Sequence, residues 1–146
     1  PSLKGRALRL LSQREHSRAE LERKLARHEE EPGTLARALD ELVAKDFISE
    51  ARVVQSVLHQ RAPRLGAARL RQELQAKGIA AEAVADAVAS LQATEVERAR
   101  ALWQRRFEGP PADAKERARQ LRFLMARGFS GATVAKVLRS GDDGHD

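Results

Sequence analysis

The amino-acid sequence predicts an all-α protein of nine helices arranged as three tandem three-helix repeats, elongated and curved. Strong helix formers (Ala, Leu, Arg, Glu and Gln) dominate the 146 residues, while glycine (9) and proline (5) are sparse. Apolar residues recur three or four positions apart in nine successive segments, which is the spacing of helices with one buried face. These segments fall into three similar groups, and such repeats pack on their neighbours to form a stack.

The first repeat is expected to cover residues 1–48. Three apolar spans predict its helices, at 3–11, 21–25 and 35–42. Ser17 and Glu20 have the spacing of a capping box, with serine at the N-cap and glutamate three residues later, so the second helix should begin there. Pro32-Gly33 marks a break before the third helix.

The second repeat is expected to cover residues 49–93. Its helices are predicted from apolar spans at 53–58, 70–74 and 84–91. Ser49 is a candidate N-cap for the first of them, and Pro63 marks the following break. Gly78 lies where the middle helix should end in the left-handed conformation.

The third repeat is expected to cover residues 94–139, followed by a disordered acidic tail over 140–146. Its helices are predicted from apolar spans at 96–107, 121–125 and 134–138. Thr94 and Glu97 have capping-box spacing, and Ser130 is a candidate N-cap after the left-handed Gly128.

The repeat period is visible in the sequence itself. At an offset of 50, the segment 74–79 (LQAKGI) falls on 124–129 (LMARGF). At an offset of 49 in the other direction, the apolar positions of 70–91 fall on those of 21–42. Two independent matches at nearly the same period indicate internal repetition.

Charge follows the same repeat. The net charge is +6, and arginine (21) far outnumbers lysine (6). The net charge alternates along the chain: +5 over 1–27, −5 over 28–50, +5 over 51–78, −4 over 79–97 and +8 over 98–139. A charge pattern tied to the repeat indicates a surface with one basic side, suited to nucleic acid or to an acidic protein surface.

The basic residues of the first two helices of each repeat are therefore the candidate contacts to a partner or to DNA. Arginine suits this role because its planar fork matches phosphate and carboxylate groups. The candidates are Arg18, Lys24, Arg61, Arg64, Arg69, Arg71, Lys77, Arg105, Arg106, Arg119, Arg122 and Arg127.

The sequence offers no catalytic constellation, so a binding protein is expected and not an enzyme. The absence of cysteine excludes disulfides, thiolate zinc sites and a cysteine nucleophile, and it fits a cytoplasmic location. The four histidines are far apart in the sequence and are expected to be exposed helix-end residues, and we expect no metal or cofactor. No apolar run reaches the roughly 20 residues needed to cross a bilayer. Trp103 is expected to pack in the core because it keeps helical spacing with Val96 and Ala99.

Three segments together resemble a known family. They are 11–25 (LSQREHSRAEL followed by KL), 47–79 (FISEAR, then RLRQEL, then KGI) and 122–130 (RFLMARGFS). In this order and spacing they resemble the bacterial RecX regulatory proteins. The resemblance implies tandem three-helix repeats and a monomeric modulator that binds along the groove of the RecA–DNA filament. It also implies inhibition of strand exchange, ATP hydrolysis and LexA cleavage, together with weak, largely sequence-independent DNA binding.

Two other functions remain open from the residues alone. Three-helix units with short turns also occur in free-standing helix-turn-helix DNA-binding proteins. The third helices of the first two repeats are acidic or apolar, however, which does not suit a recognition helix in a major groove. A helical scaffold without any role in nucleic-acid binding is the other alternative.

Overall fold

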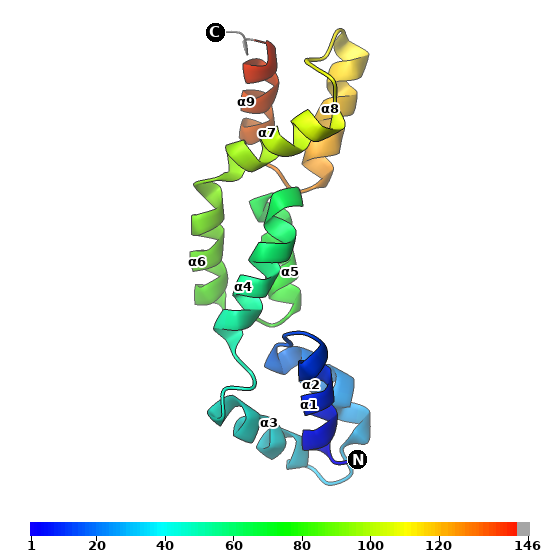
Figure 1. Ribbon diagram of the computed structural model, residues 1–146, viewed down its shortest axis with the longest axis vertical. Coiled ribbons are helices and arrows are strands. Elements are labelled where there is room, and N and C mark those ends of the chain that lie inside the picture. The colour runs from blue at the N-terminus through cyan, green and yellow to red at the C-terminus, as the bar shows by residue number, and fades with distance from the viewer. Residues whose placement is uncertain (143–146) are drawn as a thin grey trace.

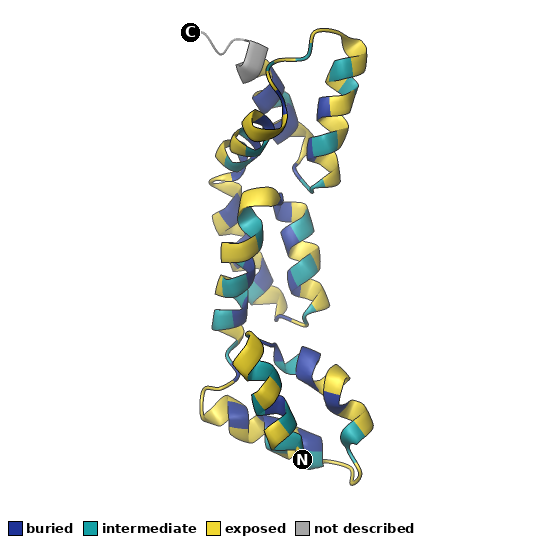
Figure 2. Cartoon of the chain, turned by 45° about the vertical axis from the view of Figure 1, so that its right-hand side comes forward, coloured by how far each residue is buried: buried dark blue, intermediate teal, exposed yellow. Residues whose placement is uncertain are grey.

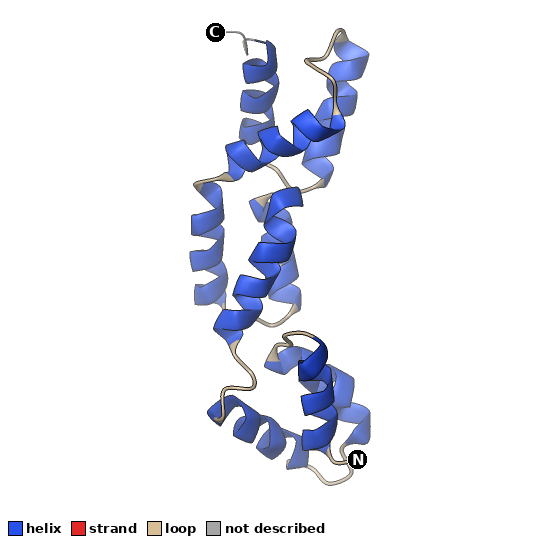
Figure 3. Ribbon diagram, in the orientation of Figure 1, coloured by secondary structure: helices blue, strands red, loops and turns tan. Residues whose placement is uncertain are grey.

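The computed structural model describes residues 1–142, and these residues confirm the predicted nine helices in three groups of three. Two short 3-10 helices, η1 (Ala26–His28) and η2 (Ala62–Arg64), were not anticipated; this part of the chain contains no strand (Figure 3). The nine α-helices are α1 (Leu3–Gln13), α2 (Arg18–Leu25), α3 (Thr34–Ala44), α4 (Glu50–Arg61), α5 (Ala67–Ala76), α6 (Ala81–Gln92), α7 (Glu95–Arg106), α8 (Ala114–Ala126) and α9 (Gly131–Asp142).

The helices form three units that follow one another along the longest axis of an elongated molecule (Figure 1). We call α1–α3 the first unit, α4–α6 the second and α7–α9 the third. Each unit buries its own apolar cluster, centred on Leu21 and Leu39, on Leu70 and Leu74, and on Leu124 and Val137, respectively. Figure 2 shows buried residues in each of the three units. The fold is therefore a row of small cores and not one large core.

Most of the helix starts and stops lie where the sequence places them. The Ser17–Glu20 capping box is complete, and the Ser49 side chain accepts a hydrogen bond from the Arg52 backbone N–H. Gly78 and Gly128 end their helices with φ of 73° and 87°, in the left-handed region.

The predicted capping box at Thr94 and Glu97 is wrong. Thr94 precedes α7, but its side chain caps no backbone N–H of that helix. The link from α6 to α7 is only two residues long, and Thr94 adopts φ −114° and ψ 5° in it, not the extended conformation of a capping residue. Its hydroxyl instead accepts a hydrogen bond from the Arg98 guanidinium at 3.1 Å.

The helical core of the third unit includes Trp103, as expected from its spacing. Trp103 is buried, and its indole N–H donates to the Gln120 side-chain oxygen at 2.8 Å. Helix α9 continues to Asp142, so the first three residues of the expected disordered tail are helical, and residues 143–146 of that tail lie outside the described residues. Within the described chain, no helix is both long enough and apolar enough to cross a bilayer.

Candidate binding surface

Three of the predicted contact residues form ion pairs between helices, and a fourth, Arg119, pairs with Glu116 within α8 at 2.9 Å. An Arg18 guanidinium nitrogen lies 2.7 Å from Asp40 of α3, and Arg61 reaches both carboxylate oxygens of Glu73 at 3.0 and 3.2 Å. The Lys77 ammonium lies 3.3 Å from Glu20, across the junction between the first two units. Because these cations already face carboxylates, their first role is to hold helices together.

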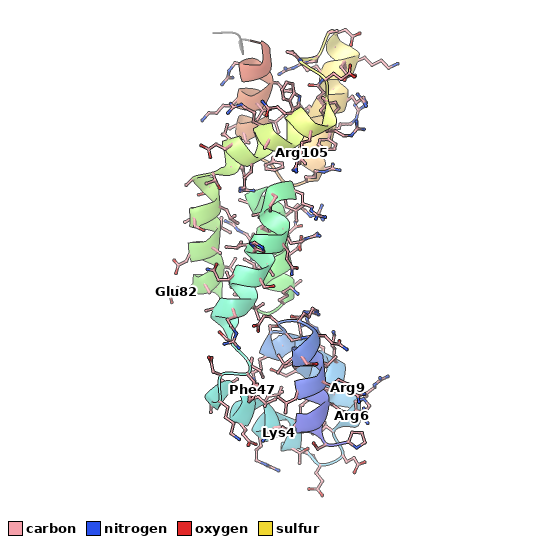
Figure 4. The ribbon with its side chains drawn as sticks, viewed as in Figure 1. Lys4, Arg6, Arg9, Phe47, Glu82 and Arg105 are labelled. Atoms are coloured by element: carbon pink, nitrogen blue, oxygen red, sulfur yellow. The ribbon has the colours of Figure 1, made fainter. Side chains whose placement is uncertain are left out.

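Four other predicted residues are exposed, and nothing in residues 1–142 forms a hydrogen bond or ion pair with their side chains. They belong to the second and third units, in η2, α5, α7 and α8. Arg105 points outward from α7 in Figure 4. We call this set the four unpaired arginines: Arg64, Arg71, Arg105 and Arg122.

Three predicted arginines of the third unit gather around two phenylalanine rings. Phe107 and Phe123 meet edge to face, with ring centroids 5.3 Å apart. Arg106 lies 5.1 and 5.5 Å from the two centroids, Arg119 lies 5.1 Å from that of Phe107, and Arg127 lies 3.7 Å from that of Phe123. Cation–π contacts hold such guanidinium groups without using their N–H donors, although Arg119 also donates to Glu116 and Arg127 to the Phe123 carbonyl, each at 2.9 Å. We call these five residues the Arg–Phe cluster.

The junction between the second and third units is tight and largely buried. The Gly66 backbone N–H donates to the Arg127 carbonyl at 2.8 Å, and the Arg69 guanidinium donates to the Ala126 carbonyl at 3.0 Å. A Cβ atom added to Gly66 would lie 2.3 Å from the Gly128 carbonyl oxygen, so only glycine permits this approach. The predicted residue Arg69 is thus part of the junction.

Glu95 and Arg98, which the sequence did not single out, complete this junction. The buried Glu95 carboxylate accepts hydrogen bonds from the Ala67 N–H at 2.8 Å, the Thr133 hydroxyl at 2.7 Å and the Ser130 N–H at 3.3 Å. Burial raises the pKa of Glu95, but these donors outweigh it and leave the pKa below its usual value. The carboxylate therefore stays charged and ties α5 to the start of α9.

Whereas Glu95 accepts hydrogen bonds at this junction, the guanidinium group of Arg98 donates them. Its guanidinium donates to three backbone carbonyls, those of Ala62, Leu65 and Leu91, which lie at the ends of η2 and α6. These contacts hold α7 against η2 and against the end of α6, where the Leu91 carbonyl also accepts from the Thr94 N–H. The only sequence signal for either residue was a charged position at the start of α7, which also fits a solvated helix end.

The junction between the first and second units uses mainly polar groups, among them the buried Ser17 and Glu20 as well as groups nearer the surface. The Ser17 hydroxyl donates to the Lys77 carbonyl at 2.6 Å, and the Arg23 guanidinium donates to the Ala76 carbonyl at 3.0 Å. Arg52 of α4 lies 2.8 Å from the Glu15 carboxylate, with both side chains partly exposed. The first unit is therefore attached through hydrogen bonds and ion pairs more than through a shared apolar core.

The expectation that all four histidines are exposed is wrong for His16, which is 1% exposed beside this junction. Its Nδ1 lies 3.1 Å from the Arg14 carbonyl, and its Nε2 lies 3.2 Å from the Nζ of Lys24, one of the predicted contacts. Burial and the charges of Arg14 and Lys24 lower the pKa of His16, so the ring is neutral and accepts from the ammonium. The sequence could not show this because the serine that follows His16 begins a helix, which suggests an exposed turn.

Cavities along the molecule are open and shallow, and within the described residues no cluster of acidic and histidine side chains could hold a metal ion. One hollow of about 670 Å³ at the second junction includes Arg105, Arg98 and Glu97. Another of about 580 Å³ includes Arg71, Lys136 and Glu95. These geometries suit contact with a charged partner surface more than enclosure of a small molecule.

Comparison with known proteins agrees with this architecture. Three family models match in order: the first, second and third three-helix domains of RecX, at residues 4–42, 49–88 and 93–138. The regulatory protein RecX of Leptothrix cholodnii is 59% identical over 145 residues, which span 99% of this chain and 92% of that protein. That of Ralstonia nicotianae is 50% identical over 141 residues, covering 97% of this chain and 89% of the relative.

Solved structures show the same fold. A crystal structure of RecX from Lactobacillus salivarius superposes with a TM-score of 0.77 at 21% sequence identity, covering 96% of this chain and 94% of that one. At 21% sequence identity, this similarity shows a shared fold and nothing further. Because three domain models in the right order and relatives of high identity cover nearly the whole sequence, the chain belongs to the RecX family of regulatory proteins.

Proposed function

We propose that this protein regulates the RecA recombinase by binding along the groove of the RecA–DNA filament. The observation that carries the proposal is the row of three separately packed units, with unpaired arginines on two of them (Figure 1). An elongated row can contact several subunits of a filament at once. Weak contacts made in this way combine through effective concentration into tight binding.

The four unpaired arginines are the proposed principal contacts to acidic RecA surface and to DNA phosphates. No carboxylate of the described residues forms an ion pair with these four arginines, whereas Arg18, Arg61 and Lys77 have carboxylate partners. The Arg–Phe cluster adds Arg106, which has ring contacts alone within residues 1–142, and the remaining donors of Arg119 and Arg127; ring contacts fix all three positions, which lowers the entropy lost on binding. Contact to DNA of this kind is mostly with phosphates and is largely sequence-independent.

Binding in the groove explains how a protein without catalytic groups could inhibit. A monomer spanning neighbouring RecA subunits would obstruct the second DNA strand and restrict the subunit movements that accompany ATP hydrolysis. Strand exchange, ATP hydrolysis and LexA cleavage would then all decrease together, in the cytoplasm where the filament forms.

The test is a RecA ATPase titration on single-stranded DNA with the four unpaired arginines replaced by glutamine. We expect the quadruple variant to need at least about 10-fold more protein for half-inhibition, since tethered contacts multiply. The control replaces four other basic residues, Lys4, Arg37, Lys45 and Lys115, and should inhibit nearly as well as the original chain. Equal loss in the two variants would show that only net charge matters.

A second measurement separates this proposal from a free-standing DNA-binding protein. Binding is compared on bare DNA and on RecA-coated DNA at the same salt concentration. A filament regulator binds the coated DNA more tightly, whereas a helix-turn-helix protein prefers bare duplex, and a scaffold binds neither.

A further inference from the structure

The first unit contains a basic trough, of whose four cations only Lys24 is among the contacts predicted from the sequence. Helices α1 and α2, together with η1, line a cavity of about 490 Å³ that is open to solvent. Its apolar floor includes Leu10 and Leu25. Arg6 and Arg9 lie along one side of α1 in Figure 4, whereas Lys4 on the same helix pairs with Glu41 of α3.

Four cations line this trough in two rows. Arg6 and Arg9 are three residues apart on α1, and Lys24 and Arg27 are three residues apart on α2 and η1. Positions three apart on a helix place Cβ atoms about 5–6 Å from each other on one face. The trough is thus bordered by cations that repeat along both walls.

The positive charge of the trough is not neutralised locally. No carboxylate lines it, whereas each of the two hollows at the second junction includes a glutamate. The nearby Glu29 carboxylate is engaged by the Leu35 backbone N–H at 2.9 Å. Burial, and then the charges of Arg6 and Arg27, lower the pKa of His28, which also lines the trough. An uncompensated cluster of this kind attracts an anion.

We propose that this trough binds the backbone of single-stranded DNA, with phosphates on Arg6, Arg9, Lys24 and Arg27 and a nucleoside against Leu10 and Leu25. Cations repeated along two walls match an anion that repeats once per nucleotide, and a charged groove that follows the backbone is typical of single-strand binding. The volume suits one or two nucleotides and not the width of a duplex. The lining includes no phenylalanine, tyrosine or tryptophan, and His28 is its one ring, which predicts little base preference.

This inference supplies a DNA contact for the proposed regulator and in that sense rests on the proposed function. It places DNA at the first unit, whereas the four unpaired arginines are on the second and third. The experiment therefore uses bare DNA without RecA. If the chain binds DNA through the trough but leaves RecA unaffected, the proposed function fails and this inference stands. If RecA is inhibited equally with and without the trough arginines and bare DNA does not bind there, only the inference fails.

The test measures fluorescence anisotropy of a labelled dodecathymidylate over a salt series. The variant carries Arg6→Gln, Arg9→Gln and Arg27→Gln, and the matched control carries Lys4→Gln, Arg37→Gln and Lys45→Gln in the same unit. Each lost phosphate contact removes about 0.7 from the slope of log affinity against log salt, so the trough variant should lose about 2. Its affinity at low salt should fall about 10-fold or more, and that of the control by less than about 2-fold. Arg9→Gln alone, at an exposed position, should give about a third of the slope change.

Three further arms decide the kind of ligand. In amide NMR spectra of the full chain, the oligonucleotide should shift the signals of Gly5, Leu10 and Leu25. Thymidine monophosphate is added as a competitor of the labelled oligonucleotide. If the mononucleotide binds as tightly as the oligonucleotide, the proposal of a strand site is overturned. Loss of hexaglutamate binding in the trough variant, with oligonucleotide binding retained, would instead make it a site for acidic peptides. Equal weakening in the variant and the control would also overturn the proposal.

Discussion

At the scale of single residues, the closest approach between units depends on Gly66. Its φ of −80° is ordinary for any residue, so a side chain here is excluded by space and not by backbone conformation. The Gly128 carbonyl oxygen would lie 2.3 Å from an added Cβ, and backbone atoms cannot move aside as a flexible side chain can. A methyl group at this position must therefore push the second and third units apart.

Replacing Gly66 by alanine should lower the free energy of unfolding by about 2 kcal/mol or more, the range of an overpacked site. For a chain of this size the melting temperature would fall by roughly 4–8 °C. The control is Gly109→Ala, because a Cβ there meets nothing within 4 Å. Thermal melts followed by circular dichroism measure both variants, and equal melting temperatures would show that the junction can widen without loss.

The residues that join the units were the hardest to predict, for a physical reason. Glu95 and Arg98 find their partners on α5, η2 and α9, far away in sequence, so no local pattern marks them. His16 was misjudged in the same way, since its burial depends on contacts with another segment. Charge alone likewise could not separate Arg61, which faces Glu73, from Arg64, which faces solvent.

At the scale of elements, helix α2 shows how one cap can serve two purposes. Ser17 accepts from the Glu20 backbone N–H inside the capping box and donates to the Lys77 carbonyl of the second unit. Glu20 accepts from the Ser17 backbone N–H and also lies near Arg14 and Lys77. The start of the helix and the junction therefore share the same carboxylate. Such elements were predictable because caps and apolar spacing are local properties of the sequence.

The charge on Glu20 makes this cap sensitive to acid. Burial raises the pKa of Glu20, but Arg14, the Ser17 N–H and Lys77 together lower it to about 2. A carboxylate with a lowered folded-state pKa contributes stability that is complete above its unfolded value, near 4.5, and is lost as the pH falls toward 2. The difference in unfolding free energy between the original chain and Glu20→Gln should therefore shrink from pH 6 to pH 2.5.

Urea unfolding at several pH values measures that difference. The full contribution of Glu20 above pH 5 should be about 3 kcal/mol at most, given the shift from 4.5 to about 2. Comparing the variant with the original chain at each pH cancels the titration of other carboxylates such as Glu41. A difference that stays constant over this range would mean that Glu20 keeps its usual pKa in the folded chain.

At the scale of the whole molecule, the two junctions differ in kind. Both junctions bury a glutamate, Glu20 in the first and Glu95 in the second, but among the described residues only the second joins backbone to backbone, and the first also depends on the partly exposed Arg52–Glu15 pair. Exposed ion pairs are weak and are screened by salt, while buried contacts are screened much less. The second and third units should therefore behave as one body, to which the first unit is more loosely attached.

This difference predicts that the first unit unfolds before the other two when salt is high. The chain has one tryptophan, Trp103, which lies in the third unit and reports on its core, whereas far-ultraviolet circular dichroism reports on all nine helices. In urea with 1 M sodium chloride, we expect the dichroism to start falling at a lower urea concentration than the Trp103 emission shifts. At low salt the two transitions should lie closer together, because the Arg52–Glu15 pair then holds the first unit more firmly.

Replacing Arg52 by glutamine should separate the two transitions even at low salt, and Arg37→Gln, on the outer face of the first unit, is the matched control. Coincident transitions in every one of these conditions would mean that the three cores unfold as a single cooperative unit, despite the weaker first junction.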